Sequence, residues 1–409
     1  MSPARIAILT SGPLCRNPRV LKEARTLGRA GHDVTVLTIA NLARFEDFDE
    51  LILRNAPFRK IAVDFVTRTP GGRFSQLFSR GGTWLARKAL RTGFESAHSL
   101  GPYRALSRLA RGFPSDLMIV HTEIALCVGC RLLADGRRIA TDFEDWHTRD
   151  LLPEAQAGRP VRLLNRVERD LMHRSVYTST TSQALARALQ TAYGGALPIV
   201  LANAFPLDPA RPPHAPQSPP SFFWFSQTIG PGRGLELFLA AWCLMKIPSR
   251  LSLLGDLQPG YREKLLSLLP EAKRPLLEFL PLVGPAELPA VIARHDIGLA
   301  LEDTSPANKD LTISNKILQY MNAGLAVVAT GTAGQREVFA RAPDVGLIVT
   351  LAATREFAAQ LNSLVANPAR IAAMGGAARR AAESTYCWEQ EEPRLLAAVT
   401  MALQHMPSG

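Results

Sequence analysis

Short apolar runs along the chain alternate with longer stretches in which apolar residues recur every three or four positions. The first two runs cover residues 5–10 (RIAILT) and 34–39 (VTVLTI), and Val20, Ala24 and Leu27 lie between them at helical spacing. A strand, a helix and a strand in so short a span are typical of a βαβ unit, in which the two strands are parallel and the helix covers the sheet.

The same alternation continues through most of the sequence. Further apolar runs predict strands at residues 116–121, 139–143, 176–182, 222–226, 251–254, 276–280, 297–301, 326–330 and 346–349. Residues at helical spacing predict helices at residues 161–173, 235–245, 286–294 and 315–323. The pattern therefore predicts an α/β protein built from doubly wound parallel sheets.

A proline-rich stretch separates the two halves of this pattern. Seven of the 15 residues from Pro206 to Pro220 are proline, which is incompatible with a helix or a central strand and favours an extended linker. We therefore expect four parts: a first domain at residues 1–205, a linker at 206–220, a second domain at 221–385, and a C-terminal helix at 386–409 that packs back on the first domain.

Composition excludes several classes of protein. The chain has 409 residues, of which 47% are hydrophobic, enough for two or three domains with their own cores and too many for a disordered chain. The five cysteines are scattered, and Cys127 and Cys130 have no second pair, so we expect reduced thiols and no metal site. Without a signal peptide or an apolar run of ~18–20 residues, we expect a cytoplasmic protein.

The formal net charge of +11 is concentrated in the first half of the chain. Residues 1–205 contain 29 basic and 18 acidic residues, whereas residues 206–409 contain 18 of each. Residues 54–111 mix 12 basic residues with aromatic ones and include only Asp64 and Glu95 as acids. This segment favours either an amphipathic surface that contacts an anionic membrane or helices whose arginines are simply solvated. Because no recognition motif is present, we do not expect nucleic acid as a partner.

The strongest local signal for a ligand lies in residues 312–337. Ser314 is suited to cap a helix whose first turn contains Asn315 and Lys316, and the unpaired amide groups of such a turn attract phosphate. The turn that ends at Gly334 opens a second helix. The residues by themselves are equally compatible with a phosphate site and with an ordinary αβα unit that has a lysine on its surface.

Residues 314–330 (SNKILQYMNAGLAVVAT) resemble the helix–glycine–strand signature of glycosyltransferase family 4. Residues 17–24 (NPRVLKEA) and 30–37 (AGHDVTVL) are similar to the first βαβ unit of that family. The resemblance implies the GT-B fold, in which two Rossmann-like domains face each other across a cleft. It also implies retaining transfer of a sugar from a nucleotide-sugar donor, with no cofactor and no metal, because cations and helix dipoles can stabilise the departing diphosphate.

The resemblance assigns candidate roles to residues of this chain. Arg233 and Lys316 would bind the donor diphosphate and His121 would face the donor sugar, which makes these three the candidate catalytic residues. The further candidates for donor binding are Gly12, Gly230, Gly232, Glu302, Ser314, Asn315, Gln319 and Gly334. A purely structural role for His121, at the end of a strand, stays an alternative.

Candidate residues for the acceptor lie in the first domain: Asn17, Asp142, Glu144 and Asp145. The acidic residues follow a strand, where carboxylates could bind sugar hydroxyls, although a solvated turn that caps the next helix would look the same. The implied acceptor is a glycan or a lipid-linked glycan precursor of polysaccharide biosynthesis. The basic segment at residues 54–111 would then contact an anionic acceptor, or an anionic membrane as a peripheral protein.

Two positions depart from the family pattern. Gln319 stands where the family commonly has the second glutamate of a pair, and Thr228 stands where it has another diphosphate-binding arginine. These departures keep two alternatives open. One is a sugar-nucleotide epimerase or phosphorylase with the same fold, and the other is a binding protein that has lost catalysis.

Overall fold

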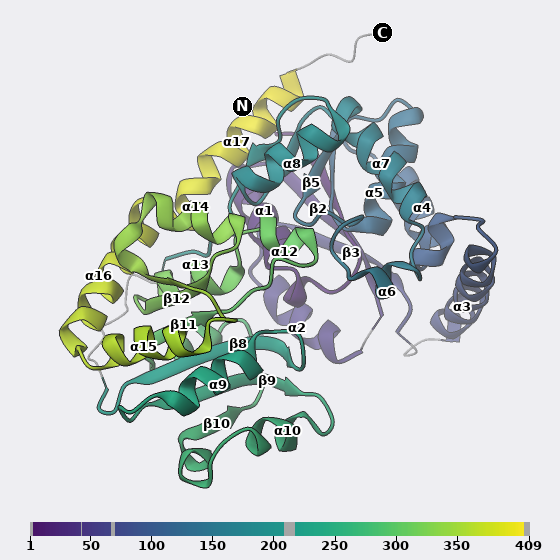
Figure 1. Ribbon diagram of the computed structural model, residues 1–409. Coiled ribbons are helices and arrows are strands. Elements are labelled where there is room, and N and C mark those ends of the chain that lie inside the picture. Colours follow the sequence, from purple (N-terminus) through teal and green to yellow (C-terminus); the bar gives the residue numbers. More distant parts are fainter. Residues whose placement is uncertain (1–2, 42, 67–69, 208–216, 405–409) are drawn as a thin grey trace. The chain divides into compact units, whose positions relative to one another are not determined.

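The structure, a computed structural model, describes residues 3–41, 43–66, 70–207 and 217–404 (Figure 1). The chain divides into two compact units: unit 1 is Met1–Leu201 with Glu392–Gly409, and unit 2 is Ala202–Glu391. Most of the expected linker, residues 208–216, and the end of the expected C-terminal helix, residues 405–409, lie outside the described residues.

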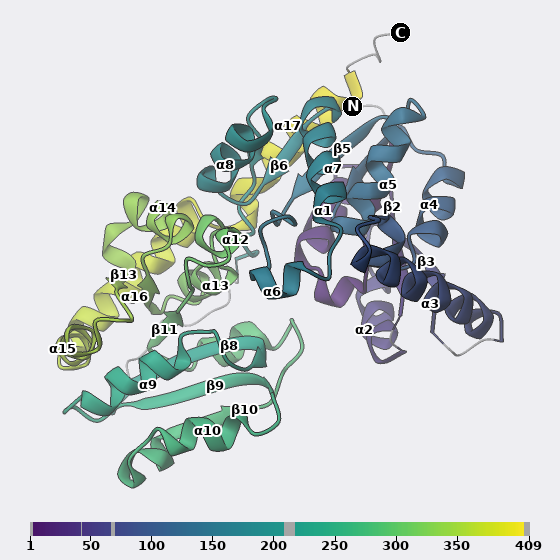
Figure 2. The same cartoon turned by 45° about the vertical axis from the view of Figure 1, so that its right-hand side comes forward.

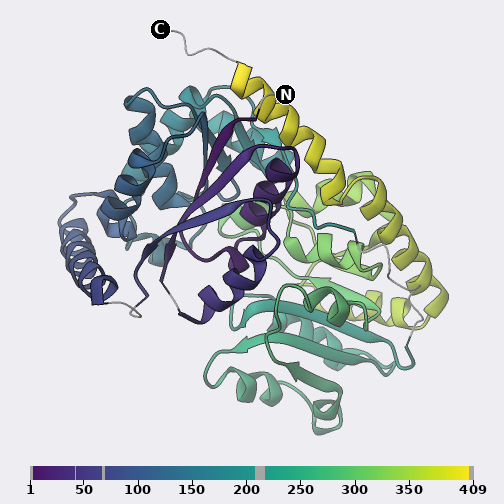
Figure 3. The same cartoon turned by 180° about the vertical axis from the view of Figure 1, so that it is seen from behind.

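Within the described ranges, unit 1 contains a sheet of seven strands in the order β3-β2-β1-β4-β5-β6-β7, all parallel. The strands are β1 (Arg5–Leu9), β2 (Asp33–Ala40), β3 (Arg59–Asp64), β4 (Leu117–Val120), β5 (Ile139–Phe143), β6 (Thr178–Thr180) and β7 (Ile199–Val200). Figure 3 shows the first three strands in purple. This is the parallel sheet that the apolar runs predict.

The helices of unit 1 cover this sheet. They are α1 (Pro18–Arg29), α2 (Ala43–Leu53), α3 (Pro70–Arg91), α4 (Tyr103–Gly112), α5 (Glu123–Ala134), α6 (Pro153–Gln156), α7 (Val161–Arg174), α8 (Gln183–Tyr193) and most of α17 (Trp388–Gln404), with short 3-10 helices η1 (Leu14–Arg16) and η2 (Ala97–Leu100). Thr26 Oγ1 in α1 donates to Glu392 Oε1 in α17 at 2.8 Å. This hydrogen bond links α1, near the start of the chain, to α17, near its end, within unit 1.

Helix α3 lies at the edge of unit 1, where it packs mainly on η2 (Figures 1 and 2). It follows β3, a strand that the apolar pattern does not predict, because Arg59, Lys60 and Asp64 interrupt its apolar residues at the edge of the sheet. None of the helices in the described part of the chain is both long enough and apolar enough to cross a membrane.

Unit 2 repeats the architecture. In the described residues its sheet has six parallel strands in the order β10-β9-β8-β11-β12-β13. They are β8 (Ser221–Ile229), β9 (Arg250–Leu257), β10 (Leu277–Leu280), β11 (Ile297–Ala300), β12 (Ala326–Thr330) and β13 (Gly346–Val349). The helices are α9 (Leu235–Leu244), α10 (Tyr261–Ser267), α11 (Leu288–Ile292), α12 (Ala307–Leu311), α13 (Asn315–Asn322), α14 (Ala333–Arg341), α15 (Thr354–Val365) and α16 (Pro368–Ser384), with η3 (Glu271–Leu276) and η4 (Pro343–Val345).

The core of unit 2 explains why β8 has apolar residues at four consecutive positions, 222–225. Phe222 and Trp224 of β8 join a buried cluster that includes residues of α9 and α15, whereas Phe223 joins a second cluster with residues of α13. Successive side chains of a strand point to opposite faces of the sheet, so β8 is covered by helices on both faces. A doubly wound sheet is therefore confirmed as the architecture of this half.

In each sheet, the order of the strands reverses next to the strand that comes first in the sequence. The order reverses between β1 and β4 in unit 1, and between β8 and β11 in unit 2. Open parallel sheets bind ligands in the crevice outside the carboxyl ends of such strands. The loops at these ends contain Gly12 and Thr122 in unit 1, and Arg233 and Glu302 in unit 2. The fold thus places the candidate residues of each unit beside its switch point.

Candidate active site

The loop between β8 and α9 supplies one cation to the switch point of unit 2. Gly232 and Gly234 have φ values of +72° and +73°, a left-handed conformation that favours glycine. A Cβ on Gly232 would meet nothing within 4 Å, whereas one on Gly230 would lie 2.7 Å from Gln258. Arg233 is half-buried and, within the described residues, makes no ion pair. Its charge is therefore available to an anion near the start of α9.

Helix α13 supplies the second cation. Lys316 Nζ lies 2.7 Å from Glu302 Oε1, and Ser314 Oγ donates to the same oxygen at 2.9 Å. Burial raises the pKa of Glu302, but the Lys316 ammonium and these two hydrogen bonds outweigh it and hold that pKa below its usual range. The ammonium also lies 5.6 Å from the ring centroid of Trp224. The Lys316 ammonium is thus held in one place by Glu302 and the Trp224 ring.

The other donor-site candidates of unit 2 differ in their surroundings. Asn315 is exposed in the first turn of α13, and Gln319 is half-buried one turn later. Gly334 packs against a neighbouring backbone, because a Cβ there would lie 2.2 Å from the carbonyl oxygen of Thr312. The close approach of α14 to this backbone accounts for the glycine without any ligand.

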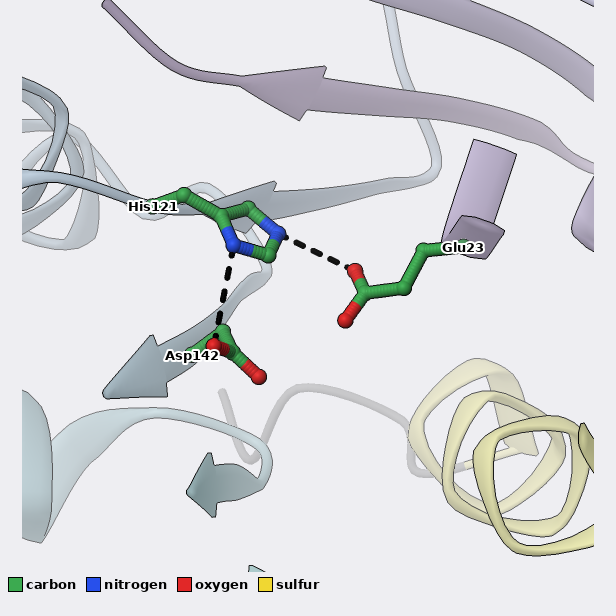
Figure 4. A group of neighbouring side chains, drawn as sticks. All are labelled: Glu23, His121 and Asp142. Carbon is green, nitrogen blue, oxygen red and sulfur yellow. Dashed lines mark hydrogen bonds and ion pairs between the residues drawn. The ribbon is translucent and has the colours of Figure 1, made fainter. Parts of the chain in front are cut away.

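In unit 1, His121 is buried between two carboxylates (Figure 4). It follows β4 and is 1% exposed. Its Nε2 lies 3.0 Å from Glu23 Oε2, and its Nδ1 lies 3.7 Å from Asp142 Oδ1. Burial lowers the pKa of His121, but the charges of Glu23 and Asp142 together raise it above its usual value. Both ring nitrogens therefore face carboxylates, an arrangement that favours the protonated form of the ring.

A buried arginine completes this cluster. Arg19 is fully buried in α1, and its Nε and Nη2 donate to the two carboxylate oxygens of Asp142 at 2.8 and 2.5 Å. Ser179 Oγ also donates to Asp142, at 2.6 Å. Arg19 thus pairs with Asp142 and also lies 3.7 Å from Glu23, the carboxylate that His121 contacts. Although Glu23, His121 and Asp142 have ligand-type atoms within 4.8 Å of one another, the guanidinium already occupies the carboxylate that a metal ion would need.

The candidate acceptor residues are only partly accessible. Asp142 was expected to face an acceptor, but it is buried and bonded to Arg19. Asn17 accepts a hydrogen bond from the amide of Val20 and so caps α1. Glu144 and Asp145 are half-buried, and burial together with the charge of Asp145 raises the pKa of Glu144 to about 7. Of the four candidates, Asn17, Glu144 and Asp145 are half-buried, and Asp142 is the one that is fully buried.

The switch point of unit 1 opens into a cavity of about 500 Å³. Gly12 lines it with φ +110°, and a Cβ there would meet nothing within 4 Å. Ser11 Oγ donates to Thr122 Oγ1 at 3.0 Å, and Thr122 has φ +66°, a conformation that β-branched residues rarely adopt. Strain of this kind is concentrated at ligand sites. Sequence reasoning identified Gly12 but missed Ser11 and Thr122, which no motif marks.

A second ionic cluster lies beside this cavity. His147 Nδ1 is 3.5 Å from Glu123 Oε2 and 3.6 Å from Asp150 Oδ2, and Arg159 pairs with both carboxylates at 3.1 and 2.6 Å. Burial lowers the pKa of His147, but Asp150 and Glu123 raise it to about 9. Because Glu123 also lines the cavity, this cluster fixes one wall. Apart from the neighbouring acidic residues Glu144 and Asp145, no sequence motif marks this cluster.

Comparison with known families decides the identity of the chain. A family model described as a glycosyl transferase 4-like domain matches residues 17–203, and a second, described as glycosyl transferase-like, matches residues 235–397. The chain belongs to the family 4 glycosyltransferases. The family and the GT-B fold that the motifs implied are thereby confirmed, and a family 4 glycosyltransferase moves a sugar from a nucleotide-sugar donor.

Solved structures similar to this family 4 glycosyltransferase cover almost all of it. HepE from Anabaena, in complex with UDP and glucose, is 19% identical with a TM-score of 0.68, over 97% of this chain and 99% of that chain. Sucrose-phosphate synthase from Thermosynechococcus elongatus is 13% identical with a TM-score of 0.69, over 97% and 98%. WaaG, a glycosyltransferase involved in lipopolysaccharide biosynthesis, is 14% identical with a TM-score of 0.62, over 96% and 99%. No curated protein sequence matches the glycosyltransferase.

Proposed function

We propose that this chain is a retaining, metal-independent glycosyltransferase that moves a hexose from a UDP-sugar to a glycan or a lipid-linked glycan precursor. The observation that carries the proposal is the pair of cations at the switch point of unit 2. Arg233, after β8, makes no ion pair within the described residues, and Lys316 is held by Glu302 at the start of α13. HepE, which binds UDP, supports the choice of nucleotide.

The proposed step transfers the sugar without a free intermediate. The acceptor hydroxyl oxygen bonds to the anomeric carbon as that carbon's bond to the diphosphate oxygen breaks. The hydroxyl proton passes to the departing diphosphate, and attack from the same side retains the configuration. Negative charge grows on the diphosphate, where Arg233, Lys316 and the amides that begin α9 and α13 would stabilise it. These groups could replace a metal ion.

The buried cluster changes the role that we propose for His121. Its nitrogens face Glu23 and Asp142, and its backbone N–H donates to the carbonyl of Leu9 at 2.9 Å. We therefore propose that His121 positions the end of β4, and with it Thr122, and does not itself touch the donor sugar.

We further propose that helix α3 brings the protein to a membrane, as a peripheral protein on the cytoplasmic face. Leu77 and Leu85 are 69% and 61% exposed, and Lys88 lies near them on the helix. Apolar and basic residues together favour an anionic lipid surface. A lipid-linked acceptor would be found at that surface, and WaaG, with its part in lipopolysaccharide biosynthesis, supports an acceptor of this class.

A screen of nucleotide sugars by thermal shift, followed by mass spectrometry of products with the best donor, tests the proposed reaction. We expect a UDP-sugar to raise the Tm and a glycan acceptor to gain one hexose, with the anomeric configuration of the donor retained by NMR. An isomeric nucleotide sugar formed without acceptor would instead identify an epimerase. Binding of a donor with no turnover of any acceptor would identify a protein that has lost catalysis.

A further inference from the structure

The cavity of unit 1 has the size and position of a ligand site. Its volume of about 500 Å³ falls within the usual range for pockets that hold small molecules, roughly 300–1,000 Å³. It begins at Ser11 and Gly12, after β1, and is bordered by α3. All of its lining residues belong to unit 1. Unit 1 therefore forms this cavity from its own residues.

One face of α3 turns toward this cavity. The lining residues of the helix are spaced three or four positions apart, or adjacent to such positions, so they lie on one side of it; they are Gln76, Ser79, Arg80, Thr83, Trp84 and Arg87. Leu77 and Leu85 are absent from this set and strongly exposed. The polar face of α3 is thus directed to the cavity and its leucines are not.

The uncharged part of the lining suits a sugar. Ser11, Asn41 and Thr83 offer hydroxyl and amide groups that can both donate and accept hydrogen bonds, as the hydroxyls of a sugar require. Phe65 and Trp84 add apolar aromatic surface for the C–H faces of a sugar ring. This combination of polar groups with an aromatic wall distinguishes the cavity from a site for a purely apolar ligand.

The charged residues of the lining favour an anionic ligand. Within the part of the chain that the structure describes, Arg80 has no ion pair, and Arg87 donates from Nε only to the neutral carbonyl of Ser99, at 3.1 Å. The acid in the lining, Glu123, is already paired with Arg159 at 3.1 Å. Two arginine charges therefore stay uncompensated beside the cavity, and a guanidinium binds phosphate or carboxylate with two parallel hydrogen bonds.

We propose that this cavity binds the acceptor, and that the acceptor is a sugar bearing an anionic group, phosphate or carboxylate, held by Arg80 and Arg87. The inference rests on the proposed transferase function and adds the chemical class of its acceptor. It also assigns a function, binding of the anionic group, to two of the basic residues in the segment at residues 54–111. The leucines of the same helix remain available to a membrane.

Binding of three sugars by the full-length protein tests the proposal. Methyl glucoside 6-phosphate, methyl glucuronide and methyl glucoside carry a phosphate, a carboxylate and no charge, so ligand-observed NMR titrations of the three distinguish the sources of the anionic group. We expect at least one anionic sugar to bind on the order of tenfold more tightly than the neutral one. Arg80→Gln and Arg87→Gln should each remove most of this preference.

Arg91→Gln is the matched control, because Arg91 is an exposed arginine of the same helix that does not line the cavity; it should keep the preference. UDP affinity, measured in parallel, should be the same in the wild type and all three variants. Equal binding of charged and neutral sugars by the wild type, or a preference that survives both Arg80→Gln and Arg87→Gln, would overturn the acceptor assignment. If the wild type does not bind UDP, this would instead contradict the transferase function, whether or not the sugars bind.

Discussion

Arg19 is an arginine in the core, and its surroundings explain how that is possible. Its guanidinium contacts both oxygens of Asp142 and donates from Nη1 to the carbonyl of Leu201 at 2.8 Å. Removing one partner of a buried ion pair leaves the other uncompensated, which costs about 3–5 kcal/mol. We therefore expect Arg19→Met to lower the free energy of unfolding by about that amount, measured by urea denaturation.

Arg5→Met is the control for that measurement. Arg5 pairs with Asp116 at 3.6 Å, but both side chains are strongly exposed, and exposed pairs contribute about 0–1 kcal/mol. A loss below 1 kcal/mol in both variants would show that the Arg19 cluster does not hold unit 1 together, and would reopen a direct catalytic role for His121.

His147 makes the stability of unit 1 depend on pH. Its pKa is raised from 6.5 to about 9, so its charged form stabilises the folded state fully below pH 6.5. This contribution is lost as the pH rises through 9. The wild type should therefore lose stability relative to His147→Asn between these two values, in urea titrations at a series of pH values. Parallel stability profiles for the two proteins would contradict the ionic cluster with Glu123 and Asp150.

At the scale of the element, we propose one role for each of two faces of α3: acceptor binding for one and membrane contact for the other. The face with Leu77 and Leu85 should bind vesicles that contain phosphatidylglycerol, and each buried leucine contributes about 1.5–3 kcal/mol. Flotation of Leu77→Ser and Leu85→Ser should therefore fall roughly tenfold each. Leu197→Ser, a change of another exposed leucine in unit 1, should float like the wild type. Equal flotation with neutral phosphatidylcholine, or none at all, would argue against membrane contact through α3.

Elements with a clean apolar pattern could be predicted from the sequence, often to within a residue. The strand expected at residues 139–143 is β5, and the helix expected at 161–173 is α7 (Val161–Arg174). The edge strand β3 was not predicted, because charged residues interrupt its apolar ones. The edge strand β7 was not predicted because it consists of only two residues, Ile199 and Val200. The basic residues of α3 were noticed, but its pattern could not tell which of them line a cavity.

At the scale of the molecule, two doubly wound units followed from the alternation of strands and helices, and the family followed from residues 314–330. The contacts between residues far apart in the sequence could not be predicted in this way. Arg19 and Asp142 are 123 positions apart, and nothing local to either residue shows that they meet in the core. Likewise Glu302 was a candidate, but its bond to Lys316 depends on how β11 and α13 pack. Sequence motifs indicate which residues take part in a site, whereas burial and pairing require the fold.

The central claim is that Arg233 and Lys316 of unit 2 bind the diphosphate of a nucleotide sugar. Calorimetric titration of UDP into the wild type, Arg233→Ala, Lys316→Ala and Lys264→Ala tests it most directly. Lys264 is an exposed lysine of α10 paired with Glu236, so its loss is the matched charge control. Because Lys316→Ala leaves Glu302 unpaired, the double variant with Glu302→Gln separates misfolding from lost contacts.

We expect the wild type and Lys264→Ala to bind UDP equally. Hydrogen bonds to charged groups contribute about 1.5–3 kcal/mol, so Arg233→Ala and Lys316→Ala, alone or with Glu302→Gln, should each weaken binding by about tenfold or more. UDP affinity that is unchanged in both Arg233→Ala and Lys316→Ala would contradict the account.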